Sequence, residues 1–282
     1  MHPALRLVRA GNLGVSFVGT LVGGLVARGA GISVPSILWL FLALAGVSTA
    51  LITAGGNVLN DLLDLEGDRV NHPDRPLVTG EISVGSARAL AVILFVGGTL
   101  VAVPVAFSEP LVAAILAAAI LLLVAYEFRF KRVGFLGNLV VAFLTGMVFL
   151  YGGAAAGNAV VLLPFAAMAF LATLSREVIK DMEDIAGDVT RSTFPKTYGM
   201  NAATGLARAA VVGGIVLSFV PLAWFVALAS WVGIIYLVLV GAADAIFGVS
   251  IGYLPDRLHY EQTMSKVAMT VALFAFLVVA FR

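Results

Sequence analysis

Apolar segments long enough to cross a lipid bilayer recur along nearly the whole chain, and this feature limits the fold more than any other. A helix needs roughly 20 apolar residues to span a hydrocarbon core about 30 Å thick. Nine such segments are predicted, at residues 12–28, 36–59, 85–107, 110–127, 134–155, 159–181, 203–220, 222–247 and 263–281. Because backbone polar groups in lipid must be satisfied within their own segment, each is expected to be helical. The sequence therefore predicts an all-α, polytopic membrane protein, with residues 1–282 forming a single transmembrane domain.

Composition agrees with a chain whose main surroundings are lipid. Hydrophobic residues make up 61% of the 282 residues and charged residues only 12%, whereas soluble chains carry roughly 25% charged residues. The net charge of +1 gives no reason to expect a nucleic-acid partner. The absence of cysteine excludes disulfides, thiolate metal sites and a cysteine nucleophile. We expect the bilayer as the partner of this chain, and no obligatory protein partner is evident.

The distribution of basic residues predicts the orientation. If nine spans alternate in direction, all but two of the 17 Lys and Arg residues fall on the side of the N-terminus, and the exceptions are Arg28 and Arg282. Basic residues collect on the cytoplasmic side of membrane proteins. We therefore expect a multi-pass cell-membrane protein with the N-terminus and the loops after the second and sixth spans in the cytoplasm, and the C-terminus outside.

Two acidic stretches interrupt the apolar pattern, at the predicted ends of the second and sixth spans. Their members recur at intervals of four, three and four residues: Asn57, Asp61, Asp64 and Asp68 in the first, and Glu177, Asp181, Asp184 and Asp188 in the second. On a helix, residues at this spacing lie on one face. Each stretch is therefore expected to present a row of oxygen atoms in one direction.

Such rows of carboxylates repel one another and are costly near a membrane, unless a cation lies between them. Mg²⁺ prefers oxygen ligands and typically bridges one or two carboxylates to substrate phosphates. Two facing rows could hold a diphosphate between them through Mg²⁺. The residues expected both to bind the metal and to act in catalysis are Asp61, Asp64, Asp68, Asp181, Asp184 and Asp188.

Basic residues accompany both acidic rows. Arg75 follows the first, Lys131 follows the fourth span, and Arg176 and Lys180 are four residues apart beside the second row. These cations could bind phosphate oxygens. The alternative explanation is topological, since positive charges gather on this side in any membrane protein, and it stays open for Lys131 above all.

The acidic runs also resemble a known family. The run from Asn60 to Asp68 resembles the NDxxDxxxD signature of the UbiA superfamily of intramembrane prenyltransferases, and the run from Asp184 to Asp188 resembles its second motif, DxxxD. The segment from Arg9 to Asn12 resembles the family's N-terminal Arg-Pro-x-Asn, with alanine in place of proline. Tyr126, the Lys131-Arg132 pair and the Gly137-Asn138 pair fit a further family pattern.

The resemblance implies nine transmembrane helices around a central cavity, with a small cytoplasmic cap from the loops after helices two and six. It implies Mg²⁺-dependent transfer of a prenyl group from a polyprenyl diphosphate donor to a lipid-like acceptor. The residues expected to bind the substrates are Asn12, Asn57, Asn60, Arg75, Tyr126, Lys131, Arg176 and Lys180.

One departure from the family pattern bears on the acceptor. Many members carry Tyr-Ala or Tyr-Ser where this chain has Lys180-Asp181. The string from Arg176 to Asp188 is instead similar to the archaeal enzymes that add a geranylgeranyl group to geranylgeranylglyceryl phosphate, which forms the second ether bond of archaeal membrane lipids. An aromatic acceptor, as in quinone, haem or chlorophyll side-chain attachment, remains the main alternative. A secondary transporter is a further alternative, but its charges should lie near the middle of the membrane.

Overall fold

The structure is a computed structural model that describes residues 2–29, 35–186, 192–224 and 226–282. Within these ranges nine helical segments are long and apolar enough to cross a membrane. The main helices of these spans are α2 (Ala10–Arg28), α3 (Ser36–Leu63), α5 (Val84–Ser108), α6 (Pro110–Phe128), α7 (Phe135–Ala155), α8 (Leu163–Glu183), α10 (Met200–Leu217), α12 (Trp231–Ser250) and α13 (Leu258–Val279). The prediction of an all-α polytopic membrane fold is confirmed.

Shorter helices connect or extend the spans. The α-helical ones are α1 (Pro3–Leu7), α4 (Leu65–Asn71), α9 (Phe194–Tyr198) and α11 (Val220–Trp224). Single turns of 3₁₀-helix lie at Phe130–Arg132, Val160–Leu162, Asp184–Ala186 and Ile251–Tyr253. Two of these short elements, α4 and the turn at Asp184–Ala186, directly follow the helices that carry the acidic rows.

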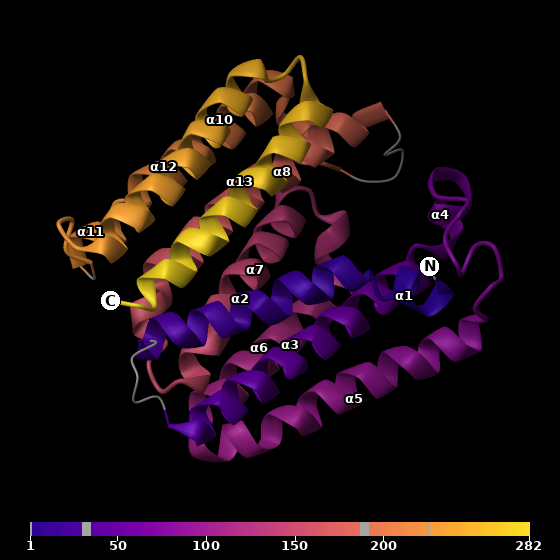
Figure 1. Cartoon of the computed structure of the whole chain (residues 1–282). Helices are drawn as coiled ribbons and strands as arrows, with labels where there is room; N and C mark the ends of the chain where they lie inside the picture. The colour runs from indigo at the N-terminus through magenta and orange to yellow at the C-terminus, as the bar shows by residue number, and fades with distance from the viewer. Residues whose placement is uncertain (1, 30–34, 187–191, 225) are drawn as a thin grey trace.

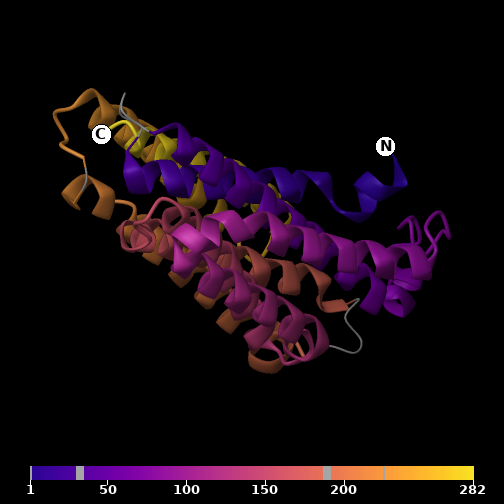
Figure 2. The same cartoon turned by 90° about the horizontal axis from the view of Figure 1, so that it is seen from below.

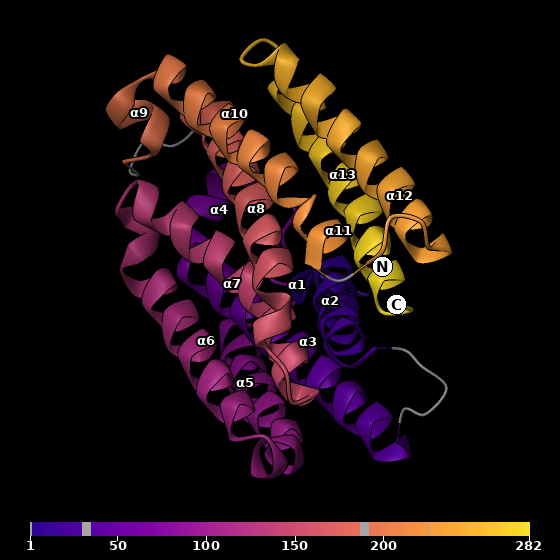
Figure 3. The ribbon, with the colours of Figure 1, turned by 90° about the vertical axis from the view of Figure 1, so that its left-hand side faces the viewer.

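The long helices form one bundle, in which α7 and α8 hold the two sides together. On one side α3 packs against α5 and α2, and on the other α12 packs against α13. Between them α7 contacts α2 and α8, and α8 contacts α10 and α13. Figures 1 and 3 both show α5 and α12 at opposite sides of the bundle, with α7 between them. Residues from both halves of the sequence can therefore face a common interior.

Glycines allow α2 and α7 to approach at backbone distance. A Cβ atom added at Gly152 would lie 2.0 Å from the carbonyl oxygen of Thr20, and one at Gly23 would lie 2.5 Å from that of Phe149. Small residues at helix contacts are typical of membrane bundles, because association in lipid depends on close packing. This contact fixes α2 beside α7, on the wall of the interior.

The chain termini lie at opposite ends of the bundle (Figures 1 and 2), as an odd number of crossings requires. We call the end that holds α1 the N-terminal end. Arg28 and Arg282, the two basic residues expected on the opposite side of the membrane from the N-terminus, lie at the other end of the bundle. There Arg282 Nη1 donates a hydrogen bond to the carbonyl of Val26 at 2.8 Å, close to Arg28 at the end of α2.

One predicted span boundary is wrong. The eighth span was expected at residues 222–247, but the structure continues the seventh through α11 to Trp224 and begins α12 at Trp231. Pro221, between the two expected spans, does not end the helical segment, because it lies in the first turn of α11, where a proline is tolerated. The real boundary is set by Ser230, whose Oγ caps α12 by accepting a hydrogen bond from the amide of Gly233 at 3.0 Å.

Candidate active site

A cavity of about 1640 Å³ opens between α2, α3, α6, α7, α8, α10, α12 and α13. Its lining on α8 runs from Met168 to Glu183, which at 1.5 Å per residue is about 22 Å along the helix. Polar residues line the part near the N-terminal end, while side chains such as Phe149 and Phe276 line the deeper part. The cavity thus combines a charged region with a long, mostly apolar one.

The structure brings most of the predicted site residues to this cavity. All eight residues expected to bind substrates line it: Asn12, Asn57, Asn60, Arg75, Tyr126, Lys131, Arg176 and Lys180. Among the predicted metal ligands, Asp64, Asp68 and Asp184 line it, whereas Asp61 and Asp181 do not. Asp188 lies outside the described residues. Their functional roles stay predictions.

The first acidic row does not lie on one continuous helix, contrary to expectation. The helix α3 ends at Leu63, and Asp64, with φ −92° and ψ 1°, separates it from α4. Asp68 therefore belongs to α4, although its amide still donates a hydrogen bond to the carbonyl of Asp64 at 2.8 Å. The break places Asp68 in the first turn of α4, where a carboxylate interacts favourably with the helix dipole. The break orients Asp64 and Asp68 independently of Asp61.

Two arginines from other elements neutralise the first row. Arg75 Nη1 lies 3.2 Å from Asp61 Oδ1 and also forms an ion pair with Asp68. Arg9 Nη2 lies 2.6 Å from Asp61 Oδ1. Asp61 is only 3% exposed, and an isolated charge at that depth would be costly without such partners. Asp61 thus joins three segments of the chain at the base of the site.

A third cation, Lys131, completes this arrangement through a residue that sequence reasoning missed. Lys131 pairs with Asp64 and lies 3.2 Å from Glu127 Oε2. Asn60 Nδ2 donates a hydrogen bond to Glu127 Oε1 at 2.9 Å. Glu127 is 7% exposed and lines the cavity. The available signal was its position four residues before Lys131 on an otherwise apolar helix, where ionisable residues are usually functional.

The predicted substrate residue Asn57 has a structural contact as well. Its Nδ2 donates a hydrogen bond to the carbonyl of Val8 at 2.8 Å, where the chain passes from α1 to α2. The next residue, Arg9, has the left-handed φ of 56°, which a non-glycine residue rarely adopts. Asn57 therefore helps to hold the segment that aims Arg9 at Asp61.

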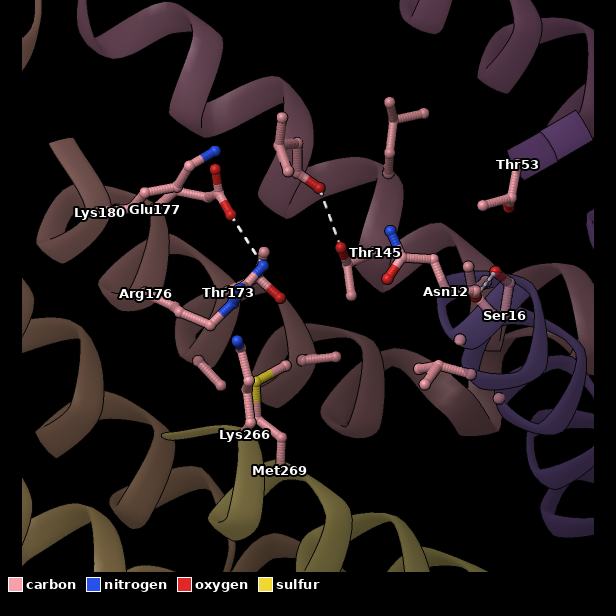
Figure 4. Close-up of a pocket in the computed structure, with 18 of the residues that line it drawn as sticks. Asn12, Ser16, Thr53, Thr145, Thr173, Arg176, Glu177, Lys180, Lys266 and Met269 are labelled. Atoms are coloured by element: carbon pink, nitrogen blue, oxygen red, sulfur yellow. Dashed lines mark hydrogen bonds and ion pairs between the residues drawn. The ribbon is translucent and has the colours of Figure 1, made fainter. Parts of the chain in front are cut away.

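The second acidic row also changes direction at a helix end. The helix α8 ends at Glu183, and Asp184 begins a 3₁₀ turn. Asp181 accepts a hydrogen bond from Asn138 Nδ2 on α7 at 2.8 Å, and Arg176 Nη2 lies 2.9 Å from Glu177 Oε1 (Figure 4). Of this row, Glu177 and Asp184 line the cavity.

The cavity-lining residues fit Mg²⁺ by the chemistry of their donor atoms. Asp64 and Asp68 from the first row and Asp184 from the second provide the oxygen ligands that this ion prefers. Within the described part of the chain, no three His, Asp or Glu side chains form a metal-binding group by themselves. Mg²⁺ sites of this type use one or two carboxylates together with substrate phosphates, so a set divided between two rows fits a metal bound with its substrate.

Two further charged residues line the cavity and were not predicted as site residues. Lys266 extends from α13. Asp244 on α12 accepts a hydrogen bond from Ser218 Oγ at 2.7 Å, deeper in the bundle. The spacing of the acidic motifs contains no information about either, because both lie on helices far along the sequence.

The fold and the cavity are those of a membrane prenyltransferase, and comparison with known proteins identifies the family. The model of the UbiA prenyltransferase family matches residues 16–280, and the chain belongs to this family. A digeranylgeranylglyceryl phosphate synthase from Methanoculleus marisnigri is 40% identical over 246 residues, which cover 86% of this chain and 82% of that protein.

Solved structures agree. A structure described as digeranylgeranylglyceryl phosphate synthase in membranes has a TM-score of 0.77 and 29% identity, covering 99% of this chain and 98% of its own. A UbiA homologue from Archaeoglobus fulgidus, bound to DMAPP and Mg²⁺, has a TM-score of 0.64 and 16% identity, covering 97% and 98%. At this low identity, the similarity to the Archaeoglobus fulgidus homologue shows only that the two chains share a fold. The chain is therefore a multi-pass membrane enzyme of the prenyltransferase class.

Proposed function

We propose that this enzyme transfers a geranylgeranyl group from geranylgeranyl diphosphate to geranylgeranylglyceryl phosphate, with Mg²⁺, and so forms the second ether bond of archaeal membrane lipids. One observation carries the proposal: two acidic rows with basic neighbours meet at the charged end of a long cavity. The chain that contains them is 40% identical to a digeranylgeranylglyceryl phosphate synthase. A transporter would need charges distributed around a midplane site.

The donor diphosphate would bind at the charged end of the cavity. Asp64, Asp68 and Asp184 would hold Mg²⁺ there, and the bound ion would supply the Lewis acidity that stabilises a leaving diphosphate. Arg75 and Lys131 would neutralise the remaining charge of the phosphate oxygens. The homologue from Archaeoglobus fulgidus is bound to DMAPP together with Mg²⁺, which supports a joint site for a prenyl diphosphate and the metal.

In the reaction the allylic C–O bond of the donor breaks, and the acceptor hydroxyl oxygen forms the new ether bond. The diphosphate leaves with the electron pair of the broken bond, and a carboxylate at the charged end takes the hydroxyl proton. The apolar walls, including Phe149 and Phe276, would surround the isoprenoid chains and exclude water, which would otherwise capture the developing allylic cation.

One assay tests this function. Purified protein is given geranylgeranyl diphosphate and a panel of acceptors, with and without Mg²⁺. Geranylgeranylglyceryl phosphate should be the preferred acceptor by kcat/KM. Preference for a hydroxybenzoate or a naphthoate would contradict the ether-lipid function and leave only the family membership.

We also propose that the N-terminal end of the bundle faces the cytoplasm, which the basic residues gathered there support. The chain has no cysteine, so single introduced cysteines report topology directly. Ser83→Cys and Ser192→Cys should both react with a membrane-impermeant reagent from the cytoplasmic side. Labelling of the two from opposite sides would contradict the alternation of spans.

A further inference from the structure

A basic residue in the interior of the last span has no function in the mechanism above. Lys266 lies eight residues after the start of α13, which is about 12 Å along the helix. It lines the cavity, and it forms no ion pair with any other residue in the described ranges. Ionisable residues at such positions are costly and usually mark a substrate site, with a partner of opposite charge.

The helix opposite Lys266 presents a second cation. The helices α13 and α8 are in contact, and in Figure 4 the Lys266 side chain points from α13 toward Arg176 on α8. Arg176 forms an ion pair with the adjacent Glu177, and it also interacts electrostatically with Glu261 on α13. The fully buried Glu261 on α13 does not line the cavity, and its Oε1 accepts from Ser265 at 2.7 Å. Of these two cations, Lys266 has no ion-pair partner among the described residues.

An unpartnered hydroxyl lies on the same face of α8. Thr173 precedes Arg176 by three residues, a spacing that places both on one helix face. Thr173 is 2% exposed, lines the cavity, and its Oγ1 has no hydrogen-bond partner within the described structure. Buried hydroxyls without a partner are uncommon in proteins, because each forfeits the hydrogen bonds it made in water. A ligand atom in the cavity would satisfy this one.

We propose that Arg176, Lys266 and Thr173 form a separate anion-binding subsite, which takes the phosphate group of the acceptor lipid. Two cations and a hydroxyl donor match the charge and the oxygen atoms of a phosphate monoester. The subsite lies beside the second acidic row, whereas Arg75 and Lys131 serve the first row. This inference rests on the proposed function, and it assigns the acceptor's phosphate to a place distinct from the donor's diphosphate.

The test compares substitutions at these positions in the purified, full-length enzyme. Lys266→Met keeps the length of the side chain and removes its charge. It should raise KM for geranylgeranylglyceryl phosphate at least about tenfold, the scale of a hydrogen bond to a charged group, and leave KM for geranylgeranyl diphosphate unchanged. Lys266→Arg should retain most of the affinity. Lys196→Met is the matched control, because Lys196 is exposed on α9, and it should change neither constant.

A binding measurement separates this inference from the proposed function. Without donor or Mg²⁺, wild-type protein should bind geranylgeranylglyceryl phosphate more tightly than unphosphorylated geranylgeranylglycerol, and Lys266→Met should reduce this difference. If Lys266→Met does not fold, Thr173→Val should weaken binding by about twofold to tenfold, as the loss of one neutral hydrogen bond does. Normal turnover of the acceptor with unchanged acceptor KM in these variants would overturn the subsite alone. No turnover of this acceptor by wild type would overturn both.

Discussion

The two acidic rows have the same spacing in sequence but different surroundings in the fold. In the first, cations from other elements neutralise the carboxylates: Asp61 meets Arg9 and Arg75, and Asp64 meets Lys131. In the second, Asp181 meets the neutral amide of Asn138. The cations near the second row come from its own helix and from α13, and they line the cavity.

This difference indicates that matched motifs can serve unequal functions. The first row is held in place by ion pairs that join it to the residue before α2, to the loop after α4 and to the 3₁₀ turn after α6. Such an arrangement suits a rigid site for the donor diphosphate. The second row has Lys180 and Lys266 beside it, and neither forms an ion pair with another residue in the described part of the chain. Cations without an ion-pair partner suit an additional anion, which the proposed acceptor would supply.

The largest expected effect concerns the metal ions that the two acidic rows would share. Because both rows would act through the same metal ions, EDTA should abolish activity completely, and Mg²⁺ or Mn²⁺ should restore it. The measurement is product formation by the purified enzyme in detergent. Full activity in the chelator would break the comparison, because neither row would then be a metal site.

Single substitutions should show that each row is necessary. Asp64→Ala in the first row and Asp184→Ala in the second should each lower kcat by at least ~100-fold, the scale of removing a key electrostatic group from a transition state. Val58→Ala and Leu62→Ala, elsewhere on α3, serve as controls for the helix itself. Near-normal turnover in a folded Asp64 or Asp184 variant would show that one row is dispensable.

Substitutions of a basic residue beside each row should affect the KM values of the donor and the acceptor differently. Arg75→Lys keeps the charge but loses the geometry that lets one guanidinium contact both Asp61 and Asp68. It should raise the donor KM by about tenfold, whereas Lys180→Ala should raise the acceptor KM by a similar factor. Steady-state kinetics with each substrate varied in turn measures both. If the two variants change the same constant, the division between the rows is wrong.

The smallest effect concerns the loop that follows the first row. Hydrogen bonds from Arg6 and Thr79 lower the pKa of Glu81 from its ordinary value, and they tie this loop to α1. A lowered carboxyl pKa contributes stability above the ordinary pKa and loses it as the pH falls through the lowered value. Glu81→Gln should therefore reduce the melting temperature slightly at pH 7, because exposed ion pairs contribute little. The difference should vanish in acid, and a difference that persists there would exclude the ion pair as its cause.

The sequence by itself determined the membrane class of this protein and the composition of its charged end. Segments such as 36–59 must be helical in lipid, because apart from a closed β-barrel only a helix satisfies the hydrogen bonds of the backbone there. The acidic residues could be found by their spacing, and all eight residues predicted to bind substrates do line the cavity. Local chemistry was sufficient for these features, because each depends on the residue and its near neighbours.

Only the tertiary structure decided which polar groups meet. Helical spacing placed Asp61 and Asp64 on one face, but the break at Asp64 and the approach of Arg9 turned Asp61 into a buried junction that does not line the cavity. Glu127 and Lys266 reach the same cavity from α6 and α13. The spacing of residues along a helix defines a face, whereas the partner of that face depends on how distant helices pack. In lipid that packing follows shape, such as the glycine contact between α2 and α7, rather than any pattern within the motif.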